Sequence, residues 1–358
     1  MAGSPYASAL GRLEPEFPAF LSKEMYATLL HGKDYADLAK LLETTPYADS
    51  IVQARTTHPG ASMVEIAINR TFVRRNRRAY EATPYAGRRV VAAYLGRWDI
   101  QNIELILSSK VNHRPVTETE DHLVSSRDIP AGLYAGVMTL DDFRLLLSQP
   151  SVEATVAALT QFGYGATVLP FLEAFERTHD IFPILAALDR QYYQDVGSAA
   201  RFFQGDEWVV RGLLASEIDV RNALLLLKAK RSDLPWTEVG SRWIPGGSLG
   251  EEAAADLYAA RGVPELAERL AERFPSVVEG TEEFRAAGNL SGYEAALQRD
   301  RAARELKRLR TYPLSLAVIF AYLLRSEVER GDLRRLAFGR LYGLSVGRLE
   351  KLLVAPAL

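Results

Sequence analysis

The sequence contains no cysteine, only five histidines and no long uncharged apolar segment. Without cysteine, the chain can form no disulfide bond and offers no thiolate as ligand or nucleophile. The longest apolar stretch, 314–324, spans eleven residues and includes Ser315, whereas a membrane-spanning helix needs about 20 residues. The first residues also lack the basic start and apolar core of a signal peptide. These absences predict a soluble chain without a transmembrane span.

The charge is balanced as well. Lys and Arg number 43 against 45 Asp and Glu, which gives a net charge of −2. This balance provides no bulk attraction to nucleic acid or to anionic membranes. Two stretches, 70–89 and 299–310, are nonetheless rich in arginine. They leave open a helical-repeat adaptor that binds nucleic acid or protein through these arginines, beside the simpler interpretation as solvated helix faces.

Motifs of catalysis are missing. Neither a phosphate-binding loop nor a dinucleotide-binding glycine motif is present. The Gly-x-Ser-x-Gly pattern of serine hydrolases occurs around Ser248 and Ser345, but a histidine must follow the nucleophile and the last histidine is His179. Both serines are therefore predicted to be helix N-caps. The histidines form no pair spaced by four residues, and the sequence predicts no catalytic residue, no cofactor and no metal site.

A polar motif, by contrast, occurs three times. Each copy has an acid first, a polar residue three positions later and a base eleven positions after the acid. The copies are Asp99, Asn102 and Lys110; Asp219, Asn222 and Lys230; and Glu329, Asp332 and Arg340. The leading acids are 120 and then 110 residues apart, which predicts three related modules. The third copy departs from the pattern, with Gly331-Asp332 where the second has Arg221-Asn222.

The spacing within the motif is helical. Offsets of 0, 3, 4, 7, 8 and 11 residues fall on one side of an α-helix, and apolar residues fill the positions between the acid and the base. Acid and base are then about 16 Å apart along the helix, at about 1.5 Å per residue. They cannot pair with each other, so each must face solvent, another helix or a partner protein.

Helical periodicity dominates the rest of the chain, and the predicted fold is all-α. The main predicted helices cover 63–82, 88–111, 181–196, 207–231, 292–309 and 313–338. Thr139 is predicted to cap the helix that follows it, and Pro313 to occupy the first turn of the last helix. Long loops at 113–132 and 232–247 separate the repeats. The predicted domains are therefore three helical modules, 1–125, 126–245 and 246–358.

Four segments carry a resemblance to a known family. They read EIDVRNALLLLKAK at 217–230, PLSLAVI at 313–319, LRRLAFGRLYGL at 333–344 and LAKLLETTPY at 38–47. In order and spacing, they resemble the family of C subunits of archaeal and vacuolar-type ATPases, whose counterpart in eukaryotic vacuolar proton pumps is the d subunit. The resemblance covers essentially the whole chain.

The resemblance implies a mechanical part without catalytic residues or cofactors. It implies three similar all-helical domains around a pseudo-threefold axis, forming a funnel whose mouth receives the D and F subunits of the central stalk. The base of the funnel would lie on the membrane proteolipid ring, and the membrane a/I subunit is a further expected neighbour. One copy per complex would then sit at the cytoplasmic face as a peripheral component and couple ATP turnover to ion or proton transport.

Two roles remain open for the polar residues of the motif. They could tie helices together inside each module, because buried acids and amides need hydrogen-bond partners. They could instead line the funnel and contact the stalk. The sequence does not separate these hypotheses.

Overall fold

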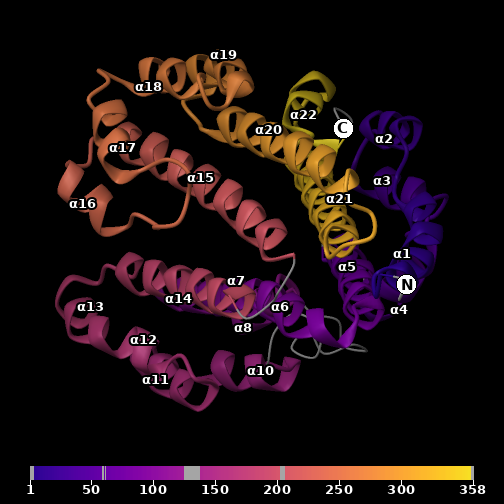
Figure 1. Ribbon diagram of the computed structural model, residues 1–358, viewed down its shortest axis with the longest axis horizontal. Coiled ribbons are helices and arrows are strands. Elements are labelled where there is room, and N and C mark those ends of the chain that lie inside the picture. The colour runs from indigo at the N-terminus through magenta and orange to yellow at the C-terminus, as the bar shows by residue number, and fades with distance from the viewer. Residues whose placement is uncertain (1–3, 59, 61, 125–137, 202–205, 356–358) are drawn as a thin grey trace. The chain divides into compact units, whose positions relative to one another are not determined.

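The computed structural model describes residues 4–58, 60, 62–124, 138–201 and 206–355, and within these ranges all regular secondary structure is helical (Figure 1). The predicted all-α fold is confirmed. No helix in the described ranges combines the length and the hydropathy needed to cross a membrane.

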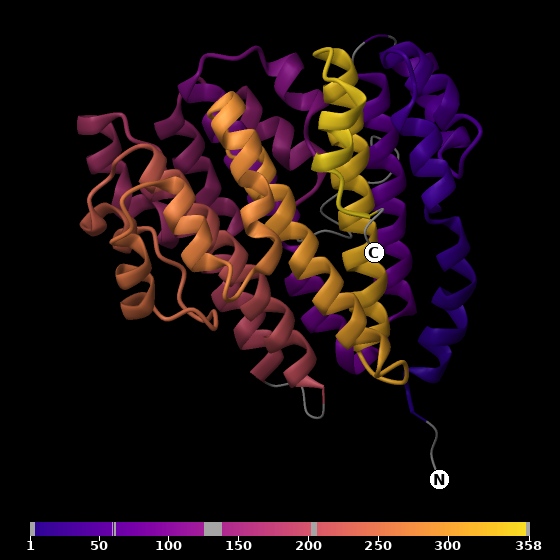
Figure 2. The ribbon, with the colours of Figure 1, turned by 90° about the horizontal axis from the view of Figure 1, so that it is seen from above.

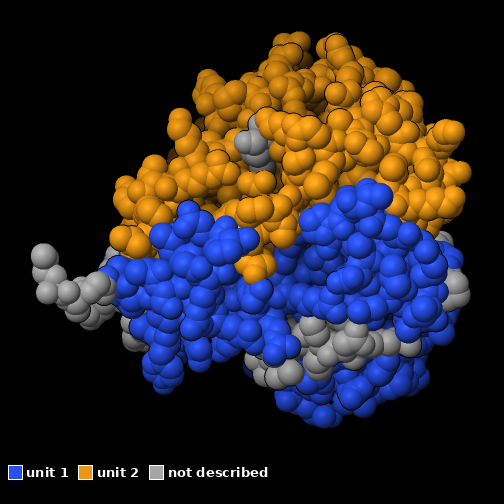
Figure 3. All heavy atoms as spheres, turned by 90° about the vertical axis from the view of Figure 1, so that its right-hand side faces the viewer, with its two compact units in different colours: residues 1–15, 42–207 blue, residues 16–41, 208–358 orange. Residues whose placement is uncertain are grey.

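The chain forms two compact units, which are coloured separately in Figure 3. Unit 1 contains residues 1–15 and 42–207, and unit 2 contains residues 16–41 and 208–358. The backbone therefore passes from one unit to the other three times. The short segment 16–41 belongs with the C-terminal part of the chain rather than with the residues that follow it.

The helices of unit 1 are mostly short, apart from α5, α7 and α14. They are α1 (Ala7–Leu13), α4 (Ala48–Thr57), α5 (Met63–Ala82), α6 (Tyr85–Leu95), α7 (Arg97–Val111), α8 (Val116–Asp121), α10 (Leu140–Ser148), α11 (Val152–Ala158), α12 (Gly165–Val168), α13 (Leu172–Thr178) and α14 (Phe182–Arg201). Phe72 of α5 meets Trp98 of α7 edge-on, with ring centroids 4.7 Å apart, and both rings are buried. Burial of each such ring stabilises the unit by about 2 kcal/mol.

Unit 2 combines two N-terminal helices with the C-terminal half of the chain. Its helices are α2 (Lys23–Leu30), α3 (Tyr35–Leu42), α15 (Glu207–Arg231), α16 (Trp236–Ser241), α17 (Glu251–Tyr258), α18 (Val263–Leu270), α19 (Gly280–Ala287), α20 (Ser291–Arg310), α21 (Ala317–Leu341) and α22 (Val346–Leu352). A continuous core runs between α15 and the helices up to α20, with Phe274 and Tyr293 fully buried in it.

A helix of 20 residues that is followed in the chain by a second long helical segment occurs three times. A helix of 20 residues comes first in each case, namely α5, α14 or α20. The second segment is α6 and α7 together, α15 or α21, and the last two have 25 residues each. The third of these pairs, α20 and α21, lies side by side as a hairpin, which we call the third hairpin (Figures 1 and 2).

The long helices match the sequence-based ranges with three differences, the first of which is that the range 181–196 stops five residues before α14 ends at Arg201. The ranges 63–82 and 207–231 are confirmed, but the range 88–111 is divided at Gly96 into α6 and α7. The placement of Pro313 in the first turn of the last helix was wrong. The helix begins at Ala317, whose N–H donates to Ser315 Oγ at 3.1 Å, so the serine hydroxyl binds the first free N–H and the proline remains in the loop.

Candidate functional site

The three motif copies lie on α7, α15 and α21. The acid and the polar residue three positions later are buried in every copy. These six residues are Asp99, Asn102, Asp219, Asn222, Glu329 and Asp332. Because a buried polar group is costly without a partner, the contacts of these side chains determine what the motif does.

The asparagine of the first two copies binds the backbone of a residue 22 positions further along the chain. Asn102 Oδ1 accepts the N–H of Val124 at 2.7 Å, and Asn102 Nδ2 donates to the carbonyl oxygen of Val124 at 3.3 Å. Asn222 makes the same pair with Ile244, at 3.1 and 2.8 Å. An asparagine amide offers one donor and one acceptor side by side. It therefore satisfies both backbone groups of the residue 22 positions further along the chain.

The third copy makes the corresponding contact with a carboxylate. Asp332 Oδ1 accepts the N–H of Val354, again 22 residues away, at 2.9 Å, and Oδ2 accepts the N–H of Ala355 at 2.7 Å. Arg335 also donates to Asp332 Oδ1 at 2.8 Å. Burial raises the pKa of Asp332, and the charge of Arg335 together with the two N–H groups offsets part of that rise.

In the third copy two residues differ together from the other copies: Asp332 replaces an asparagine and Arg335 replaces a leucine. We call this pair of differences the matched exchange. The position three residues after the asparagine is Leu105 in the first copy and Leu225 in the second. Arginine thus appears only in the copy where a carboxylate replaces the amide. Since a buried carboxylate needs a compensating charge, the arginine explains how the third copy tolerates its departure from the pattern.

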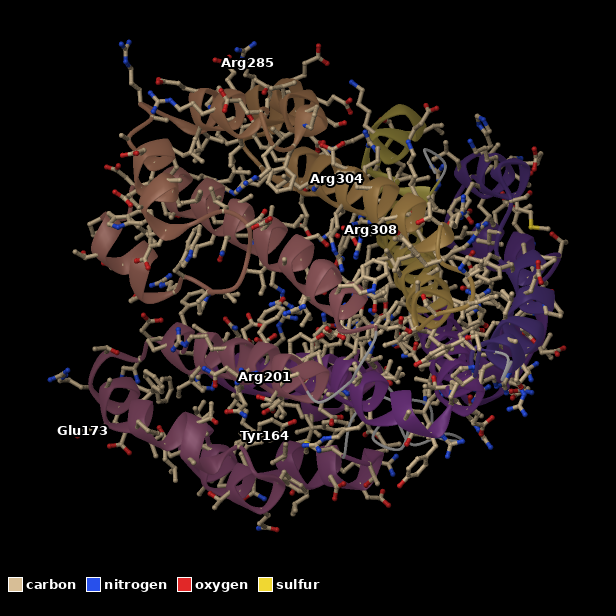
Figure 4. The ribbon with its side chains drawn as sticks, in the orientation of Figure 1. Tyr164, Glu173, Arg201, Arg285, Arg304 and Arg308 are labelled. Carbon is tan, nitrogen blue, oxygen red and sulfur yellow. The ribbon has the colours of Figure 1, made fainter. Side chains whose placement is uncertain are left out.

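The leading acids fix the beginning of a short helix. Each accepts the backbone N–H of the residue two positions before that helix begins. The pairs are Asp99 Oδ2 with Met138 before α10 at 3.4 Å, Asp219 Oδ1 with Leu249 before α17 at 2.8 Å, and Glu329 Oε2 with Leu21 before α2 at 2.6 Å. Burial, followed by the negative charge of Asp99, raises the pKa of the phenol of Tyr164, which is labelled in Figure 4.

The bases fix the end of the same short helices. Lys110 Nζ donates to the carbonyl oxygens of Leu147 and Gln149 at the end of α10, at 3.0 and 2.5 Å, and burial lowers its pKa. Arg340 donates to the carbonyl oxygen of Leu30, the last residue of α2. A cation at the C-terminus of a helix binds its free carbonyl groups and favours its dipole.

The second copy uses an aromatic ring instead of a carbonyl group. Lys230 Nζ lies 3.9 Å from the centroid of the Tyr258 ring, and Tyr258 is the last residue of α17. The hydroxyl of Tyr258 in turn donates to the carbonyl oxygen of Leu234 at 2.6 Å. The lysine therefore holds the end of α17 through a cation–π contact.

We call each of these arrangements a helix clamp: a long helix that holds a short helix at both ends through the acid and the base of the motif. The short helices have eight or nine residues, which is about 12 to 14 Å. With two flanking residues, this length matches the span of about 16 Å between acid and base. The spacing of eleven residues in the motif thus corresponds to the length of the short helix together with its two flanking residues.

The third clamp joins the two ends of the chain. Its long helix is α21, but its short helix is α2 from the N-terminal segment. Both belong to unit 2. Sequence reasoning found the acid and the base of this copy and missed their partners, because nothing in residues 16–41 repeats a motif of the long helices.

A second repeated contact lies two positions before the leading acid. Arg97 on α7 donates to the hydroxyl of Tyr192 on α14 at 3.2 Å, and Arg301 on α20 donates to Glu217 on α15 at 3.1 Å. Tyr192 and Arg301 are each the eleventh residue of their 20-residue helix. The same pair of positions therefore connects two long helices within each unit, α7 with α14 and α15 with α20, although the chemistry differs. Sequence reasoning missed these contacts.

The expected helix caps have mixed outcomes. Thr139 caps α10 through a capping box with Asp142, as predicted. Ser248 does not cap α17, whose N-cap position is Gly250; its hydroxyl donates to Asp219 instead. Ser345 stands at the N-cap position of α22, but its side chain makes no capping hydrogen bond.

Several arginines of the two basic stretches bind other parts of the chain. Arg70 donates to Gln53 at 2.9 Å, and the buried Arg75 donates to the hydroxyl of Tyr47 at 3.3 Å. In the second stretch Arg301 is paired with Glu217. Within the described ranges, no group of three or more His, Asp or Glu residues is placed to hold a metal ion.

Comparison with known proteins gives a consistent result. A model of the protein family described as ATP synthase (C/AC39) subunit matches residues 18–352. The chain is 33% identical over 351 residues to the C subunit of the A-type ATP synthase of Thermoplasma acidophilum, covering 98% of each chain. It is 32% identical to that of Thermoplasma volcanium, covering 94% of this chain and 95% of the relative. For Methanocaldococcus jannaschii, the identity is 21%, over 98% of this chain and 87% of the relative.

Proposed function

This chain belongs to the ATP synthase (C/AC39) subunit family, and from that membership we propose that it is the rotor part that joins the central stalk to the membrane ring. As a member of that family, it is a structural and non-catalytic component of the ATP synthase complex. The proposed partners are the D and F subunits of the stalk on one side and the proteolipid ring on the other. In this role one copy, at the cytoplasmic face, passes torque between ATP turnover and ion transport.

The observation that carries the proposal is the set of three helix clamps within a chain that matches this family from residue 18 to residue 352. A torque-bearing part must resist shear between neighbouring helices. Hydrogen bonds and charged contacts at both ends of a helix oppose sliding along its axis, whereas apolar packing alone is non-directional. Three such clamps suit a coupling element better than they suit a catalyst.

The clamps also support a proposal about the modules. The predicted boundaries at 125/126 and 245/246 lie one residue beyond Val124 and Ile244, the residues held by the two motif asparagines. We propose three modules built around α7, α15 and α21, with the segment 16–41 completing the third. We further propose that they take the pseudo-threefold funnel arrangement of the family.

The role proposed for the nine motif residues is to hold each module together. Their contacts on α7, α15 and α21 are with neighbouring segments of the same unit. Contacts with the stalk are then left to side chains outside the motif.

The test is recovery of the tagged chain from its native, detergent-solubilised membranes, with every co-purifying protein identified. Recovery of the D and F subunits together with the proteolipid would support the coupling role. Recovery of nucleic acid or of unrelated proteins without any ATPase component would overturn it and favour the adaptor. An intermediate result is equally decisive: the proteolipid without the D and F subunits would place the chain on the ring but contradict its attachment to the stalk.

A further inference from the structure

The loop between α20 and α21 exposes apolar side chains at the tip of the third hairpin. Tyr312 and Leu314 are exposed to 48% and 54%. Tyr312 packs edge-on against the partly exposed Trp208 of α15, with ring centroids 4.6 Å apart. The Trp208 and Tyr312 rings therefore meet in unit 2, and the exposed Pro313 and Leu314 follow Tyr312 in the same loop.

The chain segment that forms this tip carries basic residues and no acidic residue. From 306 to 326 no acidic residue occurs, whereas Lys307 and Arg310 are exposed on the last turn of α20. The local counter-charges are Asp206 and Glu207, which precede Trp208 in the chain. The tip itself thus combines exposed apolar surface with positive charge.

Other bases of α20 are already engaged, which leaves Lys307 and Arg310 as the outward-facing pair. Arg308 donates to Glu305 at 2.5 Å and lies over the Trp208 ring at 5.7 Å. Arg304 lies over the Phe274 ring at 5.4 Å. Both arginines project from α20 in Figure 4. The guanidinium of Arg308 thus packs on the Trp208 ring, which in turn contacts the Tyr312 ring.

We propose that this tip docks on the headgroup layer of an anionic lipid membrane. Tyrosine and tryptophan are favoured at the boundary between water and hydrocarbon, and each Lys or Arg near an anionic leaflet adds electrostatic attraction to it. In this arrangement Tyr312 and Leu314 enter the headgroup layer, while Lys307 and Arg310 bind lipid phosphates. We call residues 307–314 the lipid tip.

A lipid surface fits this tip better than a protein does. A stable protein interface needs about 800 Å² on each side, and two half-exposed side chains on a short loop provide much less. Shallow insertion of a few apolar side chains, combined with basic residues, is sufficient for reversible binding to a membrane. The exposed apolar side chains and the exposed bases Lys307 and Arg310 both match that requirement.

This inference rests on the proposed function, which brings the chain to a membrane, but its test does not depend on the other components of the complex. Purified full-length chain is sedimented with vesicles of phosphatidylcholine alone and with vesicles that also contain phosphatidylglycerol. We expect binding to the second kind only, and weaker binding as the salt concentration rises.

Two variants and a matched control locate the contact. The variant Tyr312→Ser with Leu314→Ser should bind roughly tenfold more weakly, because its apolar contribution is removed. The variant Lys307→Glu with Arg310→Glu should also lose at least about tenfold. The control, Leu341→Ser with Tyr342→Ser, changes two exposed apolar residues at the opposite end of α21 (44% and 76% exposed) and should bind like the unmodified chain.

Two results would overturn the lipid tip. One is the absence of binding to anionic vesicles, or equal losses in the tip variants and in the control. The other is a tip variant that binds vesicles normally but no longer recovers the proteolipid from membranes, since the tip would then bind protein. Normal recovery of the stalk components and the proteolipid by an unmodified chain that ignores vesicles would leave the coupling role standing while removing the lipid tip.

Discussion

Leu21 donates its backbone N–H to Glu329 Oε2 at 2.6 Å, although 308 residues separate them in the chain. At the other end of the same short helix, Leu30 binds Arg340 in the same way that the end of α10 binds Lys110. The third repeat is therefore completed by the N-terminus. The acid and the base of the motif bind the two ends of a short helix in this copy as in the first, although here that helix is far away in the sequence.

The first prediction concerns the leading acid of the second clamp. Asp219→Ala removes the acceptor for Leu249 and Ser248 and leaves a buried N–H without a partner. We expect the free energy of unfolding to fall by about 2 to 4 kcal/mol, measured by urea denaturation. Asp256→Ala on the exposed face of α17 should change it by less than about 0.5 kcal/mol. A stable Asp219→Ala chain that binds the stalk poorly would instead place this residue at an interface.

The second prediction concerns a chain in which the second motif copy is given the Asp and Arg of the third copy. Asn222→Asp puts a carboxylate at a position with no exposed surface and removes the donor to Ile244, so we expect a loss of about 2 to 4 kcal/mol. Adding Leu225→Arg supplies the charge that Arg335 gives to Asp332. The double variant should recover about 1 kcal/mol beyond the sum of the single changes, as measured by a double-mutant cycle. A strictly additive cycle would contradict the matched exchange.

The third prediction concerns pH. Burial raises the pKa of Asp332 above its ordinary value, which is about 4. The native chain therefore holds this proton at pH values where the unfolded chain has lost it, so this residue's contribution to stability falls as the pH rises through the folded pKa. Asp332→Asn does not titrate and should show a flatter dependence of unfolding free energy on pH above about pH 4. Equal slopes for the two chains would refute the assignment.

The fourth prediction concerns a base. Lys110→Met keeps the apolar stem but removes the donor to Leu147 and Gln149. We expect the end of α10 to open more readily, with a loss of about 1 to 2 kcal/mol, seen as faster amide hydrogen exchange in α10. Exchange in α14 should remain unchanged, because none of these hydrogen bonds involves α14. Uniformly faster exchange throughout unit 1 would indicate general destabilisation instead.

Much of the fold was predictable because the long helices carry their own periodicity. The ranges 63–82 and 207–231 agree with α5 and α15, since caps and apolar spacing point to the same limits. The N-terminal helices α1, α2 and α4 were missed. They are short, and the apolar side chains that they bury, such as Leu13 and Ile51, are too few to form a pattern in sequence. Tertiary contacts stabilise such helices.

The candidate site was predictable only in part, for a related reason. A repeated residue such as Asn102 or Asn222 can be recognised from its spacing, but its backbone partner can be any residue type. Val124, Ile244 and Val354 share a position and a contact rather than a polar side chain. Every residue has the same main-chain groups, so a contact with them leaves no residue preference in the sequence. The motif could therefore be recognised from the sequence, whereas its hydrogen-bond partners could not.

The N-terminal segment in unit 2 also sets the order in which the protein can be completed. During synthesis, α2 leaves the ribosome early, and its side chains Tyr26, Leu29 and Leu30 are buried in the finished unit. Glu329 and Arg340 are synthesised 308 and 310 residues after the groups that they bind. Closing so large a loop is slow compared with forming local helices. The third clamp is therefore among the last contacts that the chain can form during its synthesis, because Arg340 must be present before it can bind the end of α2.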